Sequence, residues 1–192
     1  MSPRKRSKKP LSSKVTARFP ELARKRGERE LIRRFLVVCE DGKSAVNYFL
    51  ALRSFLRLSP QSLVIKGSED HTQPIQVVTR AVELMVGAAA ETSATEPFDQ
   101  VWCVIDGDFG SKINNARVKA TAKGVRLAVS TKCFEYWVLL HFEEYDKASL
   151  DCGSLVSTLR AKHIPDYAKG SCDFQKIVES VREAARRAKK LR

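Results

Sequence analysis

The chain has 192 residues, with 35 lysines and arginines against 22 aspartates and glutamates, so its formal net charge is +13. Hydrophobic residues make up 43% of it, which is enough to fill a core and excludes a wholly disordered chain. No apolar run reaches the ~20 residues that a membrane-spanning helix needs, and no apolar stretch follows the charged N-terminus as in a secretory signal. We therefore expect a cytoplasmic protein with no membrane partner.

The cysteines are odd in number, scattered, and without a C-x-x-C pair. They are Cys39, Cys103, Cys133, Cys152 and Cys172. This pattern is typical of reduced thiols in a cytosol, so we expect no disulfide and no zinc module.

The positive charge is concentrated at the two ends of the chain. Residues 1–34 hold 13 basic and 3 acidic residues, and residues 182–192 hold 6 basic and 1 acidic. Residues 35–181 hold 16 basic and 18 acidic residues, as an ordinary folded domain does. We expect residues 1–34 to form a basic, largely disordered arm and residues 35–192 to form one folded domain. The arm fits phosphate contact and a solubilising tail equally well.

Short apolar runs alternate with segments of helical periodicity. The patterns predict strands at 35–39, 62–66, 100–105 and 125–130, and helices at 44–58, 72–91, 111–123, 133–142, 153–162 and 173–190. The last helix has an apolar stripe opposite a basic outer face that we expect to meet phosphates or an acidic partner. The alternation predicts an α/β fold with a mostly parallel four-stranded sheet and helices on both faces.

Two of the predicted strands end in acidic residues. Glu40 follows the first strand, and Asp106 and Asp108 follow the third, with Gly107 between them. Ligands of open parallel sheets bind outside the carboxyl ends of the strands, where these acids would converge. Carboxylates that converge repel each other unless a cation lies between them, and Mg²⁺ takes one or two carboxylates with water or phosphate oxygens. The alternative is that both aspartates form turns and cap helices.

Three segments resemble the RloB family. They are FLVVCEDGKS over 35–44, VWCVIDGD over 101–108, and STKCFEYWVLLHF over 130–142, with Tyr167-x-Lys169-Gly170 further on. A glutamate after the first strand and D-x-D after the third also resemble the TOPRIM arrangement of topoisomerases, primases and OLD-type nucleases.

The resemblance implies a TOPRIM-like, Rossmann-type three-layer sandwich. It also implies a nuclease dependent on Mg²⁺ or Mn²⁺, which cleaves DNA or RNA as an effector of abortive infection in phage defence. Glu40 would serve as general acid/base or metal ligand, and Asp106 and Asp108 as metal ligands. Proteins of this kind are often encoded beside an ABC-type ATPase, which is the partner we expect besides nucleic acid.

One position departs from the family pattern. The family usually has a second glutamate where this chain has Ala45, and Asp41 is a candidate accessory acid in its place. The departure favours the alternative function, a non-catalytic nucleic-acid-binding or adaptor subunit of a defence ATPase.

Three further residues are candidates for the site. Lys43 and Lys132 lie in turns after the first and fourth strands and are candidates to bind substrate, although Lys43 fits a solvated turn equally well. Glu135 starts an apolar helix, where a buried carboxylate needs a partner, so it either joins the acidic site or pairs locally.

Overall fold

The computed structural model describes residues 33–68, 73–90, 96–146, 151–170 and 172–191. Most of the predicted arm lies outside these residues. The strands are β1 (Phe35–Cys39), β2 (Leu63–Gly67), β3 (Gln100–Ile105) and β4 (Arg126–Val129). The helices are α1 (Ser44–Phe55), α2 (Pro74–Ala90), α3 (Lys112–Ala122), α4 (Phe134–Leu139), α5 (Cys152–Lys162) and α6 (Val181–Lys190). Short 3₁₀ turns cover η3 (Gly107–Phe109) and η4 (Val178–Ser180).

The four strands form one parallel sheet in the order β2-β1-β3-β4. The register pairs Phe35 with Leu63 of β2 and with Gln100 of β3. All four carboxyl ends consequently meet at one edge, and the predicted α/β fold with a four-stranded sheet is confirmed.

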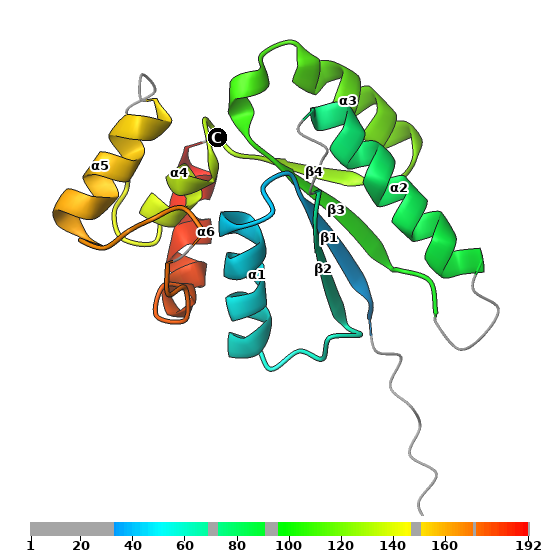
Figure 1. The fold of residues 1–192 in the computed structure, drawn as a ribbon, viewed down its shortest axis with the longest axis horizontal. Coiled ribbons are helices and arrows are strands. Elements are labelled where there is room, and N and C mark those ends of the chain that lie inside the picture. Colours follow the sequence, from blue (N-terminus) through cyan, green and yellow to red (C-terminus); the bar gives the residue numbers. More distant parts are fainter. Residues whose placement is uncertain (1–32, 69–72, 91–95, 147–150, 171, 192) are drawn as a thin grey trace, which may run out of the picture. The chain divides into compact units, whose positions relative to one another are not determined.

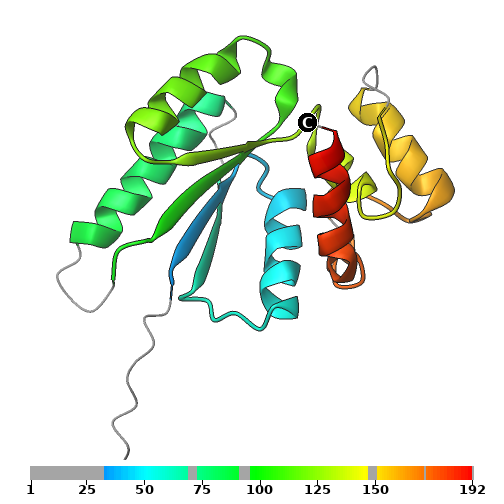
Figure 2. The same cartoon turned by 180° about the vertical axis from the view of Figure 1, so that it is seen from behind.

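Side chains of β1 alternate between two apolar cores. Leu36 and Val38 face a core with α2 and α3, whereas Val37 and Cys39 face a core with α1 and helices α4 to α6. Figures 1 and 2 show α2 and α3 on one face of the sheet and α1 on the other, so that the sheet is the middle layer of three. The central strand is therefore buried on both sides, as its continuous apolar run predicts.

The C-terminal segment differs from its prediction. The helix predicted over 173–190 begins only at Val181, because the preceding residues form turns that insert Phe174, 3% exposed, into the core. Asp173 accepts a hydrogen bond from the N–H of Gln175 at 3.1 Å in one of these turns. Arg187 is not part of the predicted basic outer face of the last helix. Its side chain turns inward and donates to the carbonyl of Leu140 at 2.7 Å.

The expectation that no disulfide forms is wrong for one pair of cysteines. Cys133, at the N-cap of α4, and Cys152, the first residue of α5, are joined with their Cα atoms 6.0 Å apart. They are 19 positions apart, so spacing alone gave no sign of the pairing. Cys39, Cys103 and Cys172 are free thiols. No helix in the described ranges is long and apolar enough to cross a membrane.

Candidate functional site at the carboxyl edge of the sheet

Glu40 and Asp106 lie side by side where β1 and β3 end. The N–H of Glu40 donates to the carbonyl of Val104 at 2.9 Å and continues the strand pairing by one step. The Glu40 carboxylate then accepts a hydrogen bond from the backbone N–H of Asp106 at 3.0 Å. The Asp106 carboxylate in turn accepts one from the Ser130 hydroxyl, after β4, at 3.3 Å. Hydrogen bonds from the ends of neighbouring strands thus hold both predicted acids in place.

Gly107 lets the loop after β4 pass directly over the turn between the two aspartates. A Cβ atom at this position would lie 2.0 Å from the carbonyl oxygen of Ser130 and 2.8 Å from that of Thr131. The Gly107 N–H donates to the carbonyl of Lys132 at 2.9 Å. Only glycine fits here, because the obstacle is backbone that cannot rotate away.

The two central carboxyl groups both have raised pKa values. Burial raises the pKa of Glu40 to about 7, and the charges of Asp106 and Asp108 add to the rise, while the hydrogen bond from the Asp106 N–H opposes it. Burial also raises the pKa of Asp106 to about 6, with contributions from the charges of Glu135 and Asp108. Carboxylates that are half-buried and close to one another in this way favour the binding of a proton or a metal cation.

Asp108 and Asp41 occupy different surroundings. Asp108 is exposed on the 3₁₀ turn η3, and its charge reaches both Glu40 and Asp106. The carboxylate of Asp41 accepts hydrogen bonds from the N–H groups of Lys43 at 2.6 Å and Ser44 at 2.8 Å. Asp41 therefore holds the turn that leads into α1 with both of its oxygens, and its charge also contributes to the raised pKa of Glu40.

Glu135 is 1% exposed and has two partners from a distant segment. The Tyr167 hydroxyl donates to one of its oxygens at 3.1 Å, and the Lys169 ammonium lies 3.3 Å from the other. Its charge also raises the pKa of Asp106, whereas the charge of Lys169 lowers it. Glu135 is therefore paired with a segment distant in the chain, and its charge also acts on the acidic site.

The two predicted lysines lie on opposite sides of the acids. Lys43 is exposed after β1, and its side chain packs against the backbone of Gly170, where a Cβ would come within 2.6 Å of it. Gly170 is further held by its N–H to Ser44 at 3.0 Å and by its carbonyl, which accepts from Asn47 at 2.8 Å. Lys132 is half-buried in the loop after β4 and is tied to the site through its backbone.

The residue pattern gives Ser130, after the fourth strand, a candidate place along the substrate path with loop chemistry as the alternative, and it gives no role to Lys169. Lys169 has a side chain that is 56% exposed, and it lies more than 120 positions from Glu40 in the chain. The only sequence signal for Lys169 is the motif Tyr167-x-Lys169-Gly170, whose tyrosine, lysine and glycine all contact parts of the site.

The family model for RloB-like proteins matches residues 35–192. The chain belongs to the RloB-like family. No curated protein matches the chain. All of the site residues described above lie within the matched region, which covers the RloB-like domain from β1 to the C-terminus.

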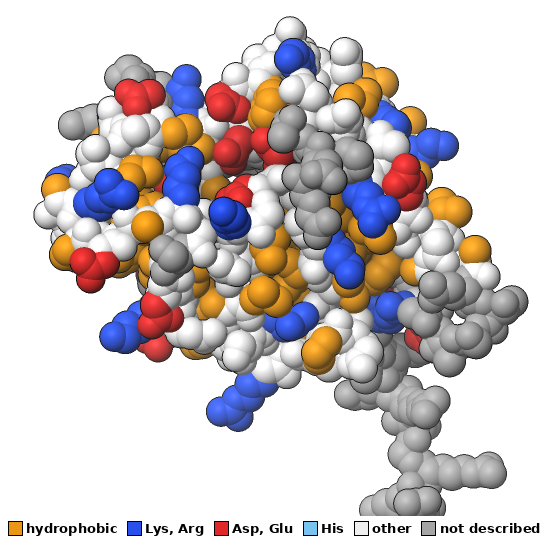
Figure 3. Space-filling view, viewed as in Figure 1, with side chains coloured by type: hydrophobic (Ala, Val, Ile, Leu, Met, Phe, Trp, Pro, Cys, Tyr) orange, Lys and Arg blue, Asp and Glu red, His pale blue; other side chains and the backbone are white. Residues whose placement is uncertain are grey.

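Figure 3 shows acidic side chains gathered in a hollow of the RloB-like domain, with basic side chains at its border. Among the described residues, no three His, Cys, Asp or Glu side chains form a ready-made metal-binding group. The donors fit a hard divalent cation in their chemistry, because Glu40 and Asp106 offer carboxylate oxygens with raised pKa values. Mg²⁺ needs only one or two carboxylates and completes its shell with water and phosphate oxygens.

Proposed function

We propose that this RloB-like protein is a phosphodiesterase that requires Mg²⁺ or Mn²⁺ and cleaves a nucleic acid, DNA or RNA, in defence against phage. The observation that carries the proposal is the pairing of Glu40 with Asp106 at the carboxyl edge of the sheet. Burial and like charges raise the pKa values of both groups, so a bound cation would relieve a real repulsion. The TOPRIM-like arrangement of the acids supports the same reaction.

The chain's own groups divide the work as follows. Asp106, Asp108 and Glu40 are the residues that would hold the cation, which when bound activates water and neutralises charge on the phosphate. Glu40, with a pKa of about 7, holds or releases a proton near neutral pH. Ser130 and the Asp106 N–H fix the two carboxylates.

Lysines on the rim are the candidates to bind the substrate phosphate. Lys43 and Lys169 lie on segments that pack together through Gly170, and both are exposed. Lys132 approaches from the loop after β4. Cations placed around an acidic centre draw a phosphodiester toward it and hold its register.

The test uses the full chain and end-labelled single-stranded and double-stranded DNA and RNA, with Mg²⁺, Mn²⁺ or EDTA. We expect cleavage that needs the divalent ion and falls at least about 100-fold in Asp106→Asn, since one correctly placed charged group contributes that much to such a reaction. Asp166→Asn is the matched control, because Asp166 is an exposed carboxylate outside the group of site residues described above. Equal cleavage by wild type and Asp106→Asn would exclude the proposed site.

A second function is favoured by Ala45. Its side chain is 2% exposed within the core, so the described chain supplies no carboxylate at this place in α1. An adaptor that binds nucleic acid and docks on a defence ATPase needs no such group. Binding of nucleic acid that is independent of divalent ions, without cleavage of any of the substrates, would support this function over the first.

A further inference from the structure

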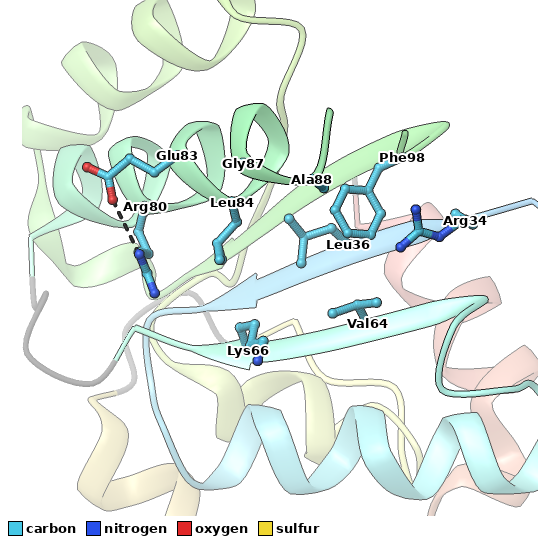
Figure 4. Close-up of a pocket in the computed structure, with 10 residues that line it drawn as sticks. All are labelled: Arg34, Leu36, Val64, Lys66, Arg80, Glu83, Leu84, Gly87, Ala88 and Phe98. Atoms are coloured by element: carbon cyan, nitrogen blue, oxygen red, sulfur yellow. Dashed lines mark hydrogen bonds and ion pairs between the residues drawn. The ribbon is translucent and has the colours of Figure 1, made fainter. Parts of the chain in front are cut away.

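A groove of about 310 Å³ runs between α2 and the edge strand β2, on the face of the sheet that α2 covers. Val64 and Lys66 point into it, because alternate residues of β2 share one face of the sheet. Figure 4 shows Leu36 and Leu84 approaching each other across the groove from the sheet and from α2. Together with Phe98, these side chains give the groove an apolar floor.

The rim of the groove is basic. Arg34 stands at one end, with its guanidinium 4.6 Å from the centre of the Phe98 ring, and Lys66 and Arg80 stand at the other (Figure 4). The single acid in the lining is Glu83, which lies 3.4 Å from Arg80 in an exposed ion pair. Three cations against one anion leave the groove positively charged.

One of these cations has unused hydrogen-bonding capacity. The Nη1 atom of Arg34 is buried and has no hydrogen-bond partner in the described part of the chain. The Nε atom of the same side chain donates to the carbonyl of Gln61 at 3.3 Å, which keeps the guanidinium in place. The carbonyl of Gln61 does not neutralise the guanidinium charge, so this end of the groove favours an anionic ligand.

The groove lies between the acidic edge of the sheet and the last residue of the basic N-terminal stretch. Lys66 pairs in register with Val38, two residues before Glu40, which places it about 7 Å along the sheet from the acidic edge. At the other end, Arg34 is the last residue of the basic stretch 1–34, whose net charge is +10. Positive charge therefore extends along the groove from Arg34 to Lys66, beside the acidic edge.

We propose that this groove binds a segment of single-stranded nucleic acid, with phosphates on Arg34, Lys66 and Arg80 and bases against the apolar floor. A duplex keeps its base faces stacked inside and offers only phosphates and groove edges. A single strand offers both phosphates and free base faces, which match a cationic rim around apolar side chains. The proposal rests on the proposed function, because the strand held here is the substrate that leads to the acids.

The first test measures binding without cleavage. A fluorescein-labelled 20-nucleotide poly-U strand and a 20-base-pair duplex are titrated with the full chain in EDTA, and anisotropy is followed at several salt concentrations. We expect the double variant Lys66→Ala/Arg80→Ala to lower the salt slope for the single strand by about 1.4, since each phosphate contact contributes ~0.7. The control Arg117→Ala/Lys123→Ala removes two exposed cations of α3 and the loop that follows it, outside the groove.

The second test fills the groove without changing its charge. A Cβ added to Gly87, which lines the groove from α2, meets nothing within 4 Å, so a side chain can be attached there without a backbone clash. We expect Gly87→Gln to weaken binding of the single strand about fivefold or more and to leave the duplex unaffected. Gly87→Ala is the matched control for the change in helix propensity.

A measurement on the unmodified protein guards against misfolded variants. Bound poly-U should protect Lys66 from acetylation, read by mass spectrometry, and leave Lys123 as reactive as before. Unchanged single-strand binding in both the double variant and Gly87→Gln, or an equal loss for the duplex, would overturn the proposal. So would binding of poly-L-glutamate that is as tight and as sensitive to Gly87→Gln, because the groove would then fit an acidic protein. Failure of the nuclease function is separate, since it would leave binding intact and abolish only cleavage.

Discussion

At the scale of single residues, the two central acids lower the stability of the folded chain at neutral pH. The pKa of Glu40 rises from its ordinary value near 4.5 to about 7 on folding. The folded chain therefore binds a proton that the unfolded chain has already lost between these two pH values. The free energy of unfolding then falls as the pH rises through that window, because the charged form is disfavoured only in the folded state.

Replacing Glu40 should remove this pH dependence. In EDTA, we expect Glu40→Gln to raise the melting temperature above that of the wild type at pH 8 and to change it little at pH 5. The amide oxygen still accepts the hydrogen bond from Asp106, so the comparison isolates the charge. Thermal unfolding followed by circular dichroism across this pH range is the measurement. An equal effect of the substitution at both pH values would contradict the raised pKa.

Gly107 should tolerate no side chain. Its Cβ would collide with two backbone carbonyls, so Gly107→Ala must displace either the loop after β4 or the turn that carries both aspartates. We expect a loss of about 3 kcal/mol in the free energy of unfolding, at the upper end for overpacking. Urea denaturation measures it. Gly87→Ala is the control, and should stabilise by about 0.5–1 kcal/mol because its added methyl group meets open space in a helix.

At the scale of elements, strands were the easiest part of the fold to predict. β1 and β3 have the predicted bounds, since a strand buried on both faces leaves a continuous apolar run between polar turns. The acids that follow them were predictable for the same reason, because parallel topology brings the carboxyl ends together. The stretch before α6 could not be predicted in this way. Phe174 and Ile177 have the spacing of a helix, but they lie in turns because their side chains are buried in the core.

Contacts between distant segments set the limit of the sequence prediction. Glu135 meets Tyr167 and Lys169 across 32 and 34 positions, in a segment without regular structure that no periodicity describes. Asp41 could not be placed from the sequence either, because its hydrogen bonds to two backbone N–H groups and its charge beside Glu40 both depend on the shape of the turn after β1. Composition also misled for Cys133 and Cys152, because a pair of cysteines is recognised by geometry and not by number.

The link between α4 and α5 should contribute to stability under oxidising conditions. It closes a loop across 19 positions, for which loss of chain entropy in the unfolded state predicts about 3 kcal/mol. We expect Cys152→Ser to lower the free energy of unfolding by about this amount without reductant and by less than about 1 kcal/mol with dithiothreitol. Cys172→Ser is the control, since Cys172 is a free, half-buried thiol. Equal stability of Cys152→Ser and wild type in air would show that the link does not form in solution.

At the scale of the whole molecule, the positive charge lies at the two ends of the sequence and the candidate site in between is acidic. Residues 35–181 have a net charge of −2, and Glu40, Asp106 and Asp108 lie together at the carboxyl edge of the sheet, where their charges repel a phosphodiester. The ends of the chain, with +10 over 1–34 and +5 over 182–192, supply the attraction that the acidic site lacks. A polyanionic substrate would therefore be attracted by the basic ends of the chain and cleaved at the acidic site. Its affinity and its cleavage rate would then depend on different residues.

This division predicts that charge in the N-terminal stretch governs affinity and leaves the rate of the chemical step unchanged. Residues 1–14 contain six lysines and arginines, and replacing all six by serine should lower the salt slope for a single strand by up to about 4. KM should rise while the cleavage rate at saturating substrate stays within about twofold, because the proposed chemical step belongs to Glu40, Asp106 and Asp108, which the variant leaves unchanged. The control exchanges the same lysines for arginines and arginines for lysines, which keeps the charge and should keep the affinity. The contrary result would be a fall in the cleavage rate at saturating substrate with an unchanged salt slope. It would place the N-terminal stretch at the reacting phosphate, because residues there affect the rate of the chemical step without changing long-range attraction.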